Sequence, residues 1–153
     1  MVWDKKKVII VAGKYDPLLR GHVESIRKAK ELGDYLIVIT HPDEIVELAR
    51  AKEGKIARCM IPLKDRVAVL GALKWVDEVV VSIDYDGESS QTLKLIRSRY
   101  PDVELIFARG GDRTPDRMPP KEIEVCREIN CEIRYGIGDL LTSASEIVSK
   151  LGE

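Results

Sequence analysis

Residues that can bind and polarise a phosphate gather in one short stretch near the start of the chain. The stretch runs from Gly13 and Lys14 to His22. It follows an unbroken apolar run at residues 8–12, which is typical of a parallel strand buried on both faces. Apolar residues then recur at helical spacing over residues 23–32. A strand, a glycine turn and a helix start form an anion site, because free amide N–H groups and the positive helix end meet there.

Two further groups of ligand-binding candidates follow later in the chain. Arg109-Gly110-Gly111-Asp112-Arg113 comes directly after an apolar run at residues 103–107, and paired glycines let a ligand approach the backbone closely. Asp112 has an alternative role as a structural turn residue. The last helical segment opens with the hydroxyl residues Thr142, Ser143 and Ser145. Hydroxyls at such a position usually serve only as helix caps.

A basic, poorly periodic segment at residues 52–58 is predicted to be a mobile loop around a glycine. Its Lys52 or Lys55 is a candidate cation for a triphosphate. Asp43 precedes a short predicted helix at residues 45–51, where it is either an N-cap or a substrate contact.

Arg66 lies in the first turn of a helix predicted over residues 62–76. A cation is unfavourable at a helix N-terminus unless an anion neutralises it there, so Arg66 is a candidate phosphate ligand. A salt bridge with Asp65 or Asp77 is an equally good explanation.

Apolar runs alternate with helical segments along the whole chain, which predicts a doubly wound, parallel α/β sheet. The strands are expected at residues 8–12, 35–40, 79–83, 103–107 and 132–135. The remaining helices are expected at residues 91–100, at residues 121–129 and from residue 142 onward. We expect a single domain over residues 1–153, with the candidate residues at the carboxyl edge of the sheet.

The first loop resembles the start of the cytidylyltransferase-like nucleotidyltransferases, in which it reads G-x-F-D-x-x-H-x-G-H. Here Tyr15-Asp16 and Gly21-His22 fit the pattern, while Leu19 replaces the first histidine. The glycine-rich segment after residue 107 and the hydroxyls after residue 141 match two further family motifs, in the same order. An arginine that the family has before these hydroxyls is missing.

The resemblance implies a five-stranded, Rossmann-like sheet with strand order 3-2-1-4-5. It also implies transfer of a nucleotidyl group to a small phosphorylated acceptor, with CTP preferred over ATP and pyrophosphate released. A phosphate monoester needs no strong general base for this attack, so catalysis reduces to positioning and charge stabilisation. The resemblance further implies a homodimer, and Mg²⁺ is expected to be held mainly by the nucleotide phosphates.

The candidate residues then divide by role. The catalytic candidates are His22, Lys14 and Arg66, and the substrate-binding candidates are Asp43 and Arg113. The nucleotide-binding candidates are Ala12, Gly13, Tyr15, Asp16, Gly21, Lys55, Arg109, Gly110, Gly111, Asp112, Thr142, Ser143 and Ser145.

The departures from the family pattern leave a second hypothesis open. Loss of one preorganised donor commonly costs about 10²–10³ in rate, and Leu19 cannot donate from its side chain. Lys14 could replace part of the missing charge, which favours an active enzyme. The alternative is a nucleotide-binding module without catalysis that acts as a sensor or partner subunit. His22 also has an alternative role, as a residue that only caps its helix locally.

Composition excludes several other classes of protein. The formal net charge of −1 offers no field for nucleic acid or an anionic membrane surface. The chain contains no long apolar run or signal-peptide pattern, so we expect a cytoplasmic protein. The three cysteines have no metal-site spacing and are expected to be reduced thiols. Charged residues make up 33% of the chain, a composition that hints at a thermophilic source.

Overall fold

A computed structural model describes residues 7–110, 113–138 and 150–151 of the chain. Five parallel strands form one sheet in the order β3-β2-β1-β4-β5. They are β1 (Lys7–Ala12), β2 (Tyr35–Thr40), β3 (Glu78–Val81), β4 (Glu104–Gly110) and β5 (Cys131–Ile137). This confirms the predicted Rossmann-like architecture and its strand order.

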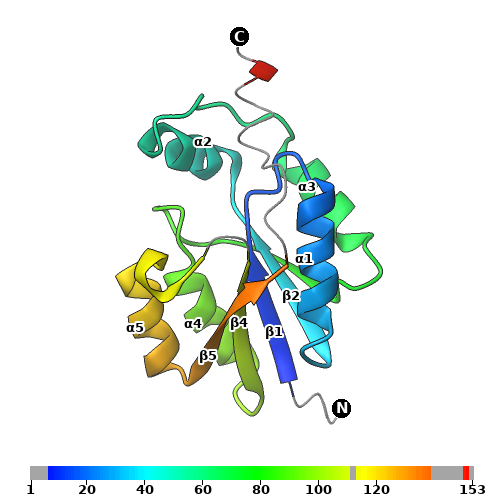
Figure 1. Ribbon diagram of the computed structural model, residues 1–153, viewed down its shortest axis with the longest axis vertical. Coiled ribbons are helices and arrows are strands. Elements are labelled where there is room, and N and C mark those ends of the chain that lie inside the picture. The colour runs from blue at the N-terminus through cyan, green and yellow to red at the C-terminus, as the bar shows by residue number, and fades with distance from the viewer. Residues whose placement is uncertain (1–6, 111–112, 139–149, 152–153) are drawn as a thin grey trace.

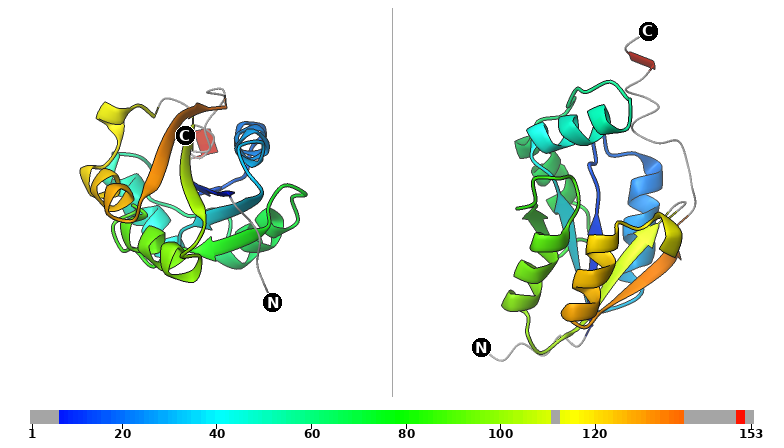
Figure 2. Two further views of the ribbon diagram at one scale, coloured as in Figure 1. Left: turned by 90° about the horizontal axis from the view of Figure 1, so that it is seen from below. Right: turned by 90° about the vertical axis from the view of Figure 1, so that its left-hand side faces the viewer.

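Helices cover both faces of the sheet (Figure 2). They are α1 (Arg20–Lys30), α2 (Asp43–Lys52), α3 (Leu63–Gly71), α4 (Ser90–Arg99) and α5 (Pro120–Glu128), with a short 3₁₀ helix at Pro115–Arg117. One face packs against α1 and α3, and the other packs against α4 and α5. The remaining helix, α2, lies across the carboxyl end of the sheet (Figure 1).

The central strand shows why its sequence lacks alternation. Val8 and Ile10 pack on the α4/α5 side, whereas Ile9 and Val11 pack on the α1/α3 side. Val8, Ile9 and Ile10 are completely buried. Because successive side chains of a strand point to opposite faces, a strand covered on both sides needs apolar residues at every position.

Helix α1 begins earlier than the apolar spacing predicted. It starts at Arg20 instead of residue 23, so Gly21 and His22 belong to its first turn. The first turn of α1 contains no acidic residue. Its free N–H groups and positive dipole end therefore lack a neutralising carboxylate of the helix itself, which favours an anion there.

Two other boundaries also differ from the prediction. Helix α3 ends at Gly71, but Leu73 and Val76 still pack on the same core through hydrogen-bonded turns, which explains their helical spacing. Strand β5 continues to Ile137 through Gly136, which has a φ of 75°. The strand therefore extends two residues beyond its predicted end at residue 135.

No helix among the described residues is long and apolar enough to cross a membrane. All three cysteines are free, as expected.

Candidate functional site

The first loop turns sharply after β1 because Gly13 lies against the ring of Tyr15. A Cβ atom at residue 13 would be 2.9 Å from Tyr15 Cζ, so a side chain there would displace the ring. The Gly13 N–H donates to the Ile39 carbonyl at 3.0 Å. The positive φ of the loop belongs to Tyr15, at 53°, and the Tyr15 ring is buried. Gly13 is thus required for close packing within the loop.

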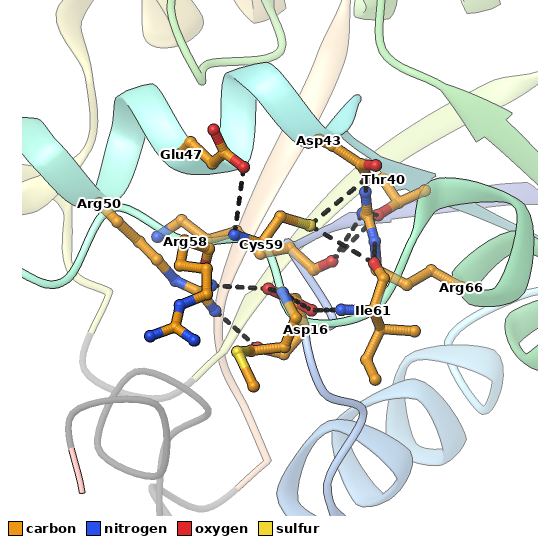
Figure 3. Close-up of polar contacts among 11 residues, drawn as sticks. Asp16, Thr40, Asp43, Glu47, Arg50, Arg58, Cys59, Ile61 and Arg66 are labelled. Carbon is orange, nitrogen blue, oxygen red and sulfur yellow. Dashed lines mark hydrogen bonds and ion pairs between the residues drawn. The ribbon is translucent and has the colours of Figure 1, made fainter. Parts of the chain in front are cut away.

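Asp16 anchors the loop from inside the protein (Figure 3). It is fully buried, and its carboxylate accepts from Arg50 Nη1 at 2.6 Å. The same carboxylate accepts the backbone N–H groups of Met60 and Ile61. Arg50 also donates to the Asp16 and Arg58 carbonyls. Asp16 was predicted to bind nucleotide, but its oxygens are already engaged, so we assign it to holding the loop.

Arg66 ties the same loop to strand β2. It is 2% exposed and donates to the carbonyls of Ile61 and Lys14, at 2.8 and 3.0 Å. It also donates to Thr40 Oγ1 at 2.9 Å and to Asp43 Oδ1 at 2.6 Å. Because every nitrogen of the guanidinium has a partner, a phosphate would have to displace one of them. We therefore assign Arg66 to positioning the loop.

Asp43 is the ion-pair partner of Arg66, in place of Asp65 or Asp77. It is the first residue of α2, whose N-cap is Pro42, so the expected N-cap role does not apply. Arg66 lowers the pKa of the Asp43 carboxyl against the opposing effect of its burial, which is the largest single contribution. Asp43 thus belongs to the network that holds the loop.

His22 is held at the N-terminus of α1 by the backbone that precedes it. Its Nδ1 accepts the Leu19 N–H at 2.9 Å, and its ring makes an edge contact with Tyr15 at 5.3 Å between centroids. Burial lowers the pKa of His22, so the imidazole is neutral near pH 7. A neutral imidazole that accepts at Nδ1 carries its proton on Nε2. Local capping therefore occupies only Nδ1 and is compatible with a donor role for Nε2–H.

Lys14 and Lys55 meet at a single carboxylate. Glu53, just after α2, accepts from Lys14 Nζ at 3.3 Å and from Lys55 Nζ at 2.9 Å. Burial lowers the pKa of Lys14, and the charge of Glu53 opposes that effect. Two residues predicted from separate segments to bind a triphosphate thus lie together. Among the described residues, Glu53 is the carboxylate that pairs with both lysines.

Arg109 and Gly110 end strand β4. The Arg109 guanidinium lies 4.8 Å from the centre of the Phe107 ring, on the α4/α5 side of the sheet. A Cβ atom at Gly110 would be 2.3 Å from the Ile137 carbonyl oxygen, so close packing of β5 already requires this glycine. Arg113 lies exposed in the following segment and donates to the Arg117 carbonyl at 3.2 Å.

Several predicted site residues fall outside the described residues. They are Gly111, Asp112, Thr142, Ser143 and Ser145. Of the remainder, Ala12 ends β1 and Gly21 lies in the first turn of α1, both beside the loop.

Two residues that pair with site candidates, Arg50 and Glu53, were not predicted from the sequence. Arg50 lies in the short helix predicted at residues 45–51, and Glu53 lies in the segment predicted to be a mobile loop. Nothing local distinguishes a buried arginine from a surface one, because its partner Asp16 is 34 positions away. The described residues contain no cluster of three histidine, cysteine or acidic side chains that could hold a metal ion.

Comparison with known proteins shows the family to which the chain belongs. The family model described as cytidylyltransferase-like matches residues 10–144. An FAD synthase of Thermococcus sibiricus is 35% identical over 97% of this chain and 95% of its own length. An FAD synthase of Pyrococcus horikoshii is 40% identical over 74% of this chain and 68% of its own length.

A solved structure shares the fold. It is described as the lipopolysaccharide core biosynthesis protein from Thermoplasma volcanium, and it superposes with a TM-score of 0.60 at 22% identity. The alignment covers 91% of this chain and 98% of the other. Since the family match runs from the second half of β1 to beyond β5 and includes the loop that carries His22, the chain belongs to the cytidylyltransferase-like family of nucleotidyltransferases.

Proposed function

We propose that this protein transfers the adenylyl group of ATP to the phosphate of FMN, forming FAD and releasing pyrophosphate. The support is similarity along nearly the whole chain to a protein named FAD synthase, together with further relatives of that name. FAD consists of FMN and AMP joined through their phosphates. Its synthesis from FMN and ATP therefore requires a new bond between the FMN phosphate and the α-phosphorus of ATP. ATP takes the place of the CTP that the family resemblance implied.

The chemistry needs few protein groups. A phosphate oxygen of FMN attacks the α-phosphorus of ATP, the bond between the α-phosphorus and its bridging oxygen breaks, and pyrophosphate leaves. The attacking oxygen is already anionic, so no general base is required. The protein must align the two phosphates and stabilise the negative charge that builds up on the α-phosphate.

His22 is the group that supports this chemistry best. Its bond to the Leu19 N–H leaves Nε2–H as a donor at the start of α1. We propose that this N–H donates to an oxygen of the α-phosphate in the transition state. Lys14 and Lys55 would leave Glu53 for the β- and γ-phosphates, since a triphosphate offers more negative charge than one carboxylate.

The remaining nucleotide contacts are proposed from the loop and the family motifs. Backbone groups of the first loop would surround the α-phosphate, and the hydroxyls near the chain end would bind the outer phosphates. These residues are Ala12, Gly13, Tyr15, Gly21, Gly110, Gly111, Asp112, Thr142, Ser143 and Ser145.

Mg²⁺ would enter with ATP as part of the substrate, held by phosphate oxygens and water. A homodimer is also proposed, and light scattering at micromolar concentration tests it.

The test is a matrix of nucleotides and acceptors. ATP or CTP, each with Mg²⁺, is incubated with FMN or with a non-flavin phosphate monoester, and products and pyrophosphate are measured. We expect FAD from ATP with FMN. A faster reaction of CTP, or of a different acceptor, would overturn the substrate assignment.

Leu19 favours a second candidate, a nucleotide-binding module without catalysis, because it removes a donor that the family pattern has. The same matrix decides this case. A nucleotide at 100 times its Kd should stabilise the fold by about 2.7 kcal/mol. Stabilisation by ATP without pyrophosphate release from any acceptor would support the binding module.

A further inference from the structure

A cluster of buried polar atoms lies on the α4/α5 side of the carboxyl edge. Five side chains there have an atom without a hydrogen-bond partner among the described residues. They are His41 (Nδ1), Glu88 (Oε2), Ser90 (Oγ), Arg109 (Nε) and Glu122 (Oε1), and we call them the polar cluster. A buried polar atom without a partner costs about 1–3 kcal/mol, so five on one side of a domain call for an explanation.

Strand alternation brings His41 and Arg109 to this side. Ile37 and Ile39 belong to the core under α4 and α5, and His41 follows two residues later. Arg109 likewise follows Phe107 and lies over its ring. Both side chains therefore extend the same face of the sheet beyond its apolar core.

The other members come from the helices that cover this face. Glu122 of α5 is 2% exposed, and its Oε2 accepts the Ser89 N–H at 2.7 Å. Ser90 begins α4 and is also 2% exposed. Glu88 precedes α4 in a loop that packs on α2, where a Cβ atom on Gly87 would lie 3.3 Å from that of Ala49.

Electrostatic interactions place His41, Glu88, Arg109 and Glu122 near one another. The hydrogen bond from the Ser89 N–H to Glu122 places Ser90 beside them. Burial raises the pKa of Glu122, and the charges of Arg109 and Glu88 act on it in opposite directions. Burial also raises the pKa of Glu88. Burial lowers the pKa of His41 to about 4; Asp84 opposes this effect, and Lys14, Arg66 and Arg109 add to it. His41 is thus neutral at pH 7, and the charge of Arg109 acts on both His41 and Glu122.

A pocket of about 420 Å³ adjoins the cluster and shares Ser90 with it. Ile83 and Tyr85 line the pocket and are 48% and 85% exposed, so an apolar and an aromatic surface are available there. Pockets of this size hold small organic ligands. Exposed aromatic side chains beside polar groups suit a flat ring that stacks on one side and hydrogen-bonds along an edge.

We infer that the polar cluster and this pocket bind the ring end of the acceptor, a planar heterocycle whose edge alternates hydrogen-bond acceptors with a donor. This inference rests on the proposed function and assigns Arg109 to the acceptor instead of the nucleotide. Arg109 Nε–H and the Ser90 hydroxyl suit two ring carbonyls. Glu122 Oε1 suits the ring N–H between them, an edge that the flavin of FMN presents as O2, N3–H and O4.

A phosphate does not suit the same place. The polar cluster and the pocket lining together contain four acids and two cations. The acids are Glu88, Glu122, Asp84 and Asp86, and the cations are Arg109 and Lys121. This excess of acidic side chains disfavours a phosphate dianion. The phosphate end of the acceptor must therefore lie away from them, toward the start of α1 and His22. The polar cluster sets which acceptor is used, and the first loop performs the transfer.

The first test uses the unaltered protein and the flavin analogue 3-methyl-FMN, in which a methyl group replaces the ring N–H donor. A site built to accept this hydrogen bond should disfavour the analogue by about 10- to 100-fold in kcat/KM. Equal use of FMN and 3-methyl-FMN would overturn the inference and leave FAD synthesis standing.

The second test is Glu122→Gln. In this variant the single amide oxygen accepts the Ser89 N–H, as Oε2 of Glu122 does. The amide NH₂ then points toward the ligand, where two donors, the NH₂ and the ring N–H, face each other. We expect KM for FMN to rise about 10-fold or more, with KM for ATP unchanged, and discrimination against 3-methyl-FMN to be lost.

Glu124→Gln is the matched control, because Glu124 lies on the same helix and is exposed. It should behave as the unaltered protein does. If Glu122→Gln has the same KM for FMN as Glu124→Gln, the inference fails and the polar cluster is only a structural feature of the fold. If the protein uses only a non-flavin acceptor, the substrate proposal and this inference both fail.

Discussion

Leu19 donates its backbone N–H to Nδ1 of His22 at 2.9 Å. The residue whose side chain departs from the family pattern thus still orients the histidine that the family retains. The bond fixes which imidazole nitrogen carries the proton, and it needs no particular side chain at position 19. The orientation of His22 therefore survives the loss of the first motif histidine.

Replacing His22 should affect catalysis far more than folding. His22→Ala removes the Nε2–H donor, and we expect kcat to fall about 10²–10³-fold. His22→Gln, which retains an N–H donor, should recover part of the rate. Steady-state kinetics and thermal melting of both variants check this. A kcat within twofold of the unaltered protein for His22→Ala would contradict the donor role.

Position 19 and position 14 can be compared directly. If Lys14 supplies the charge that the family takes from its first histidine, Leu19→His should help little. Lys14→Ala should then lower kcat and kcat/KM together, as expected for a group that acts in the transition state. Pyrophosphate release by both single variants and the double variant tests their coupling. An unchanged kcat and KM for Lys14→Ala would show that Lys14 is only a surface charge.

Asp16→Asn should strongly destabilise the fold. The change leaves Arg50, whose side chain is 1% exposed, without a charged partner. Breaking one side of a buried ion pair typically costs about 3–5 kcal/mol. Urea unfolding measures the difference. Asp65→Asn on the exposed side of α3 is the control and should change stability by about 0.5 kcal/mol or less. A similarly small effect at Asp16 would refute its anchoring role.

His41 should make stability fall in mild acid. Burial lowers its pKa to about 4 from the ordinary 6.5, so below pH 6.5 the unfolded chain binds a proton that the folded protein does not. Stability is therefore lost as pH falls from 6.5 toward 4, by up to about 3 kcal/mol. His22, whose pKa is also lowered, adds to the loss in the same direction.

The contribution of His41 is isolated by comparison with His41→Gln. Urea unfolding at several pH values between 7 and 4 should show a shallower decline for this variant, since the other titrating groups are shared. Parallel pH profiles for the two proteins would contradict the buried, neutral state of His41.

The sheet was predictable from local sequence patterns, and the reaction class was predictable from the family resemblance. Strand β1 was recognisable from its continuous apolar run, because a parallel strand covered on both faces needs apolar residues at every position. His22 stood out because a glycine-rich loop before a helix forms a phosphate site by its own geometry. The strand order was read from the family resemblance and proved correct.

Element boundaries were predicted less well. Helix α1 starts at Arg20 because the His22 side chain and the Leu19 backbone complete its first turn, a bond that apolar spacing does not report. Strand β5 runs to Ile137 because close packing against Gly110 holds it in the sheet, and that neighbour is distant in sequence.

The sequence by itself determined the layers, the loop and the family, because these follow from hydrophobic period, glycine placement and short motifs. Only the tertiary structure decided which charged residues are free to act. Asp16 and Arg66 resemble ligand contacts in the sequence, but each is fully engaged with partners from distant segments. Glu122 resembles a surface residue, but α5 buries it beside Arg109. Burial and pairing depend on contacts across the fold, and no local pattern encodes them.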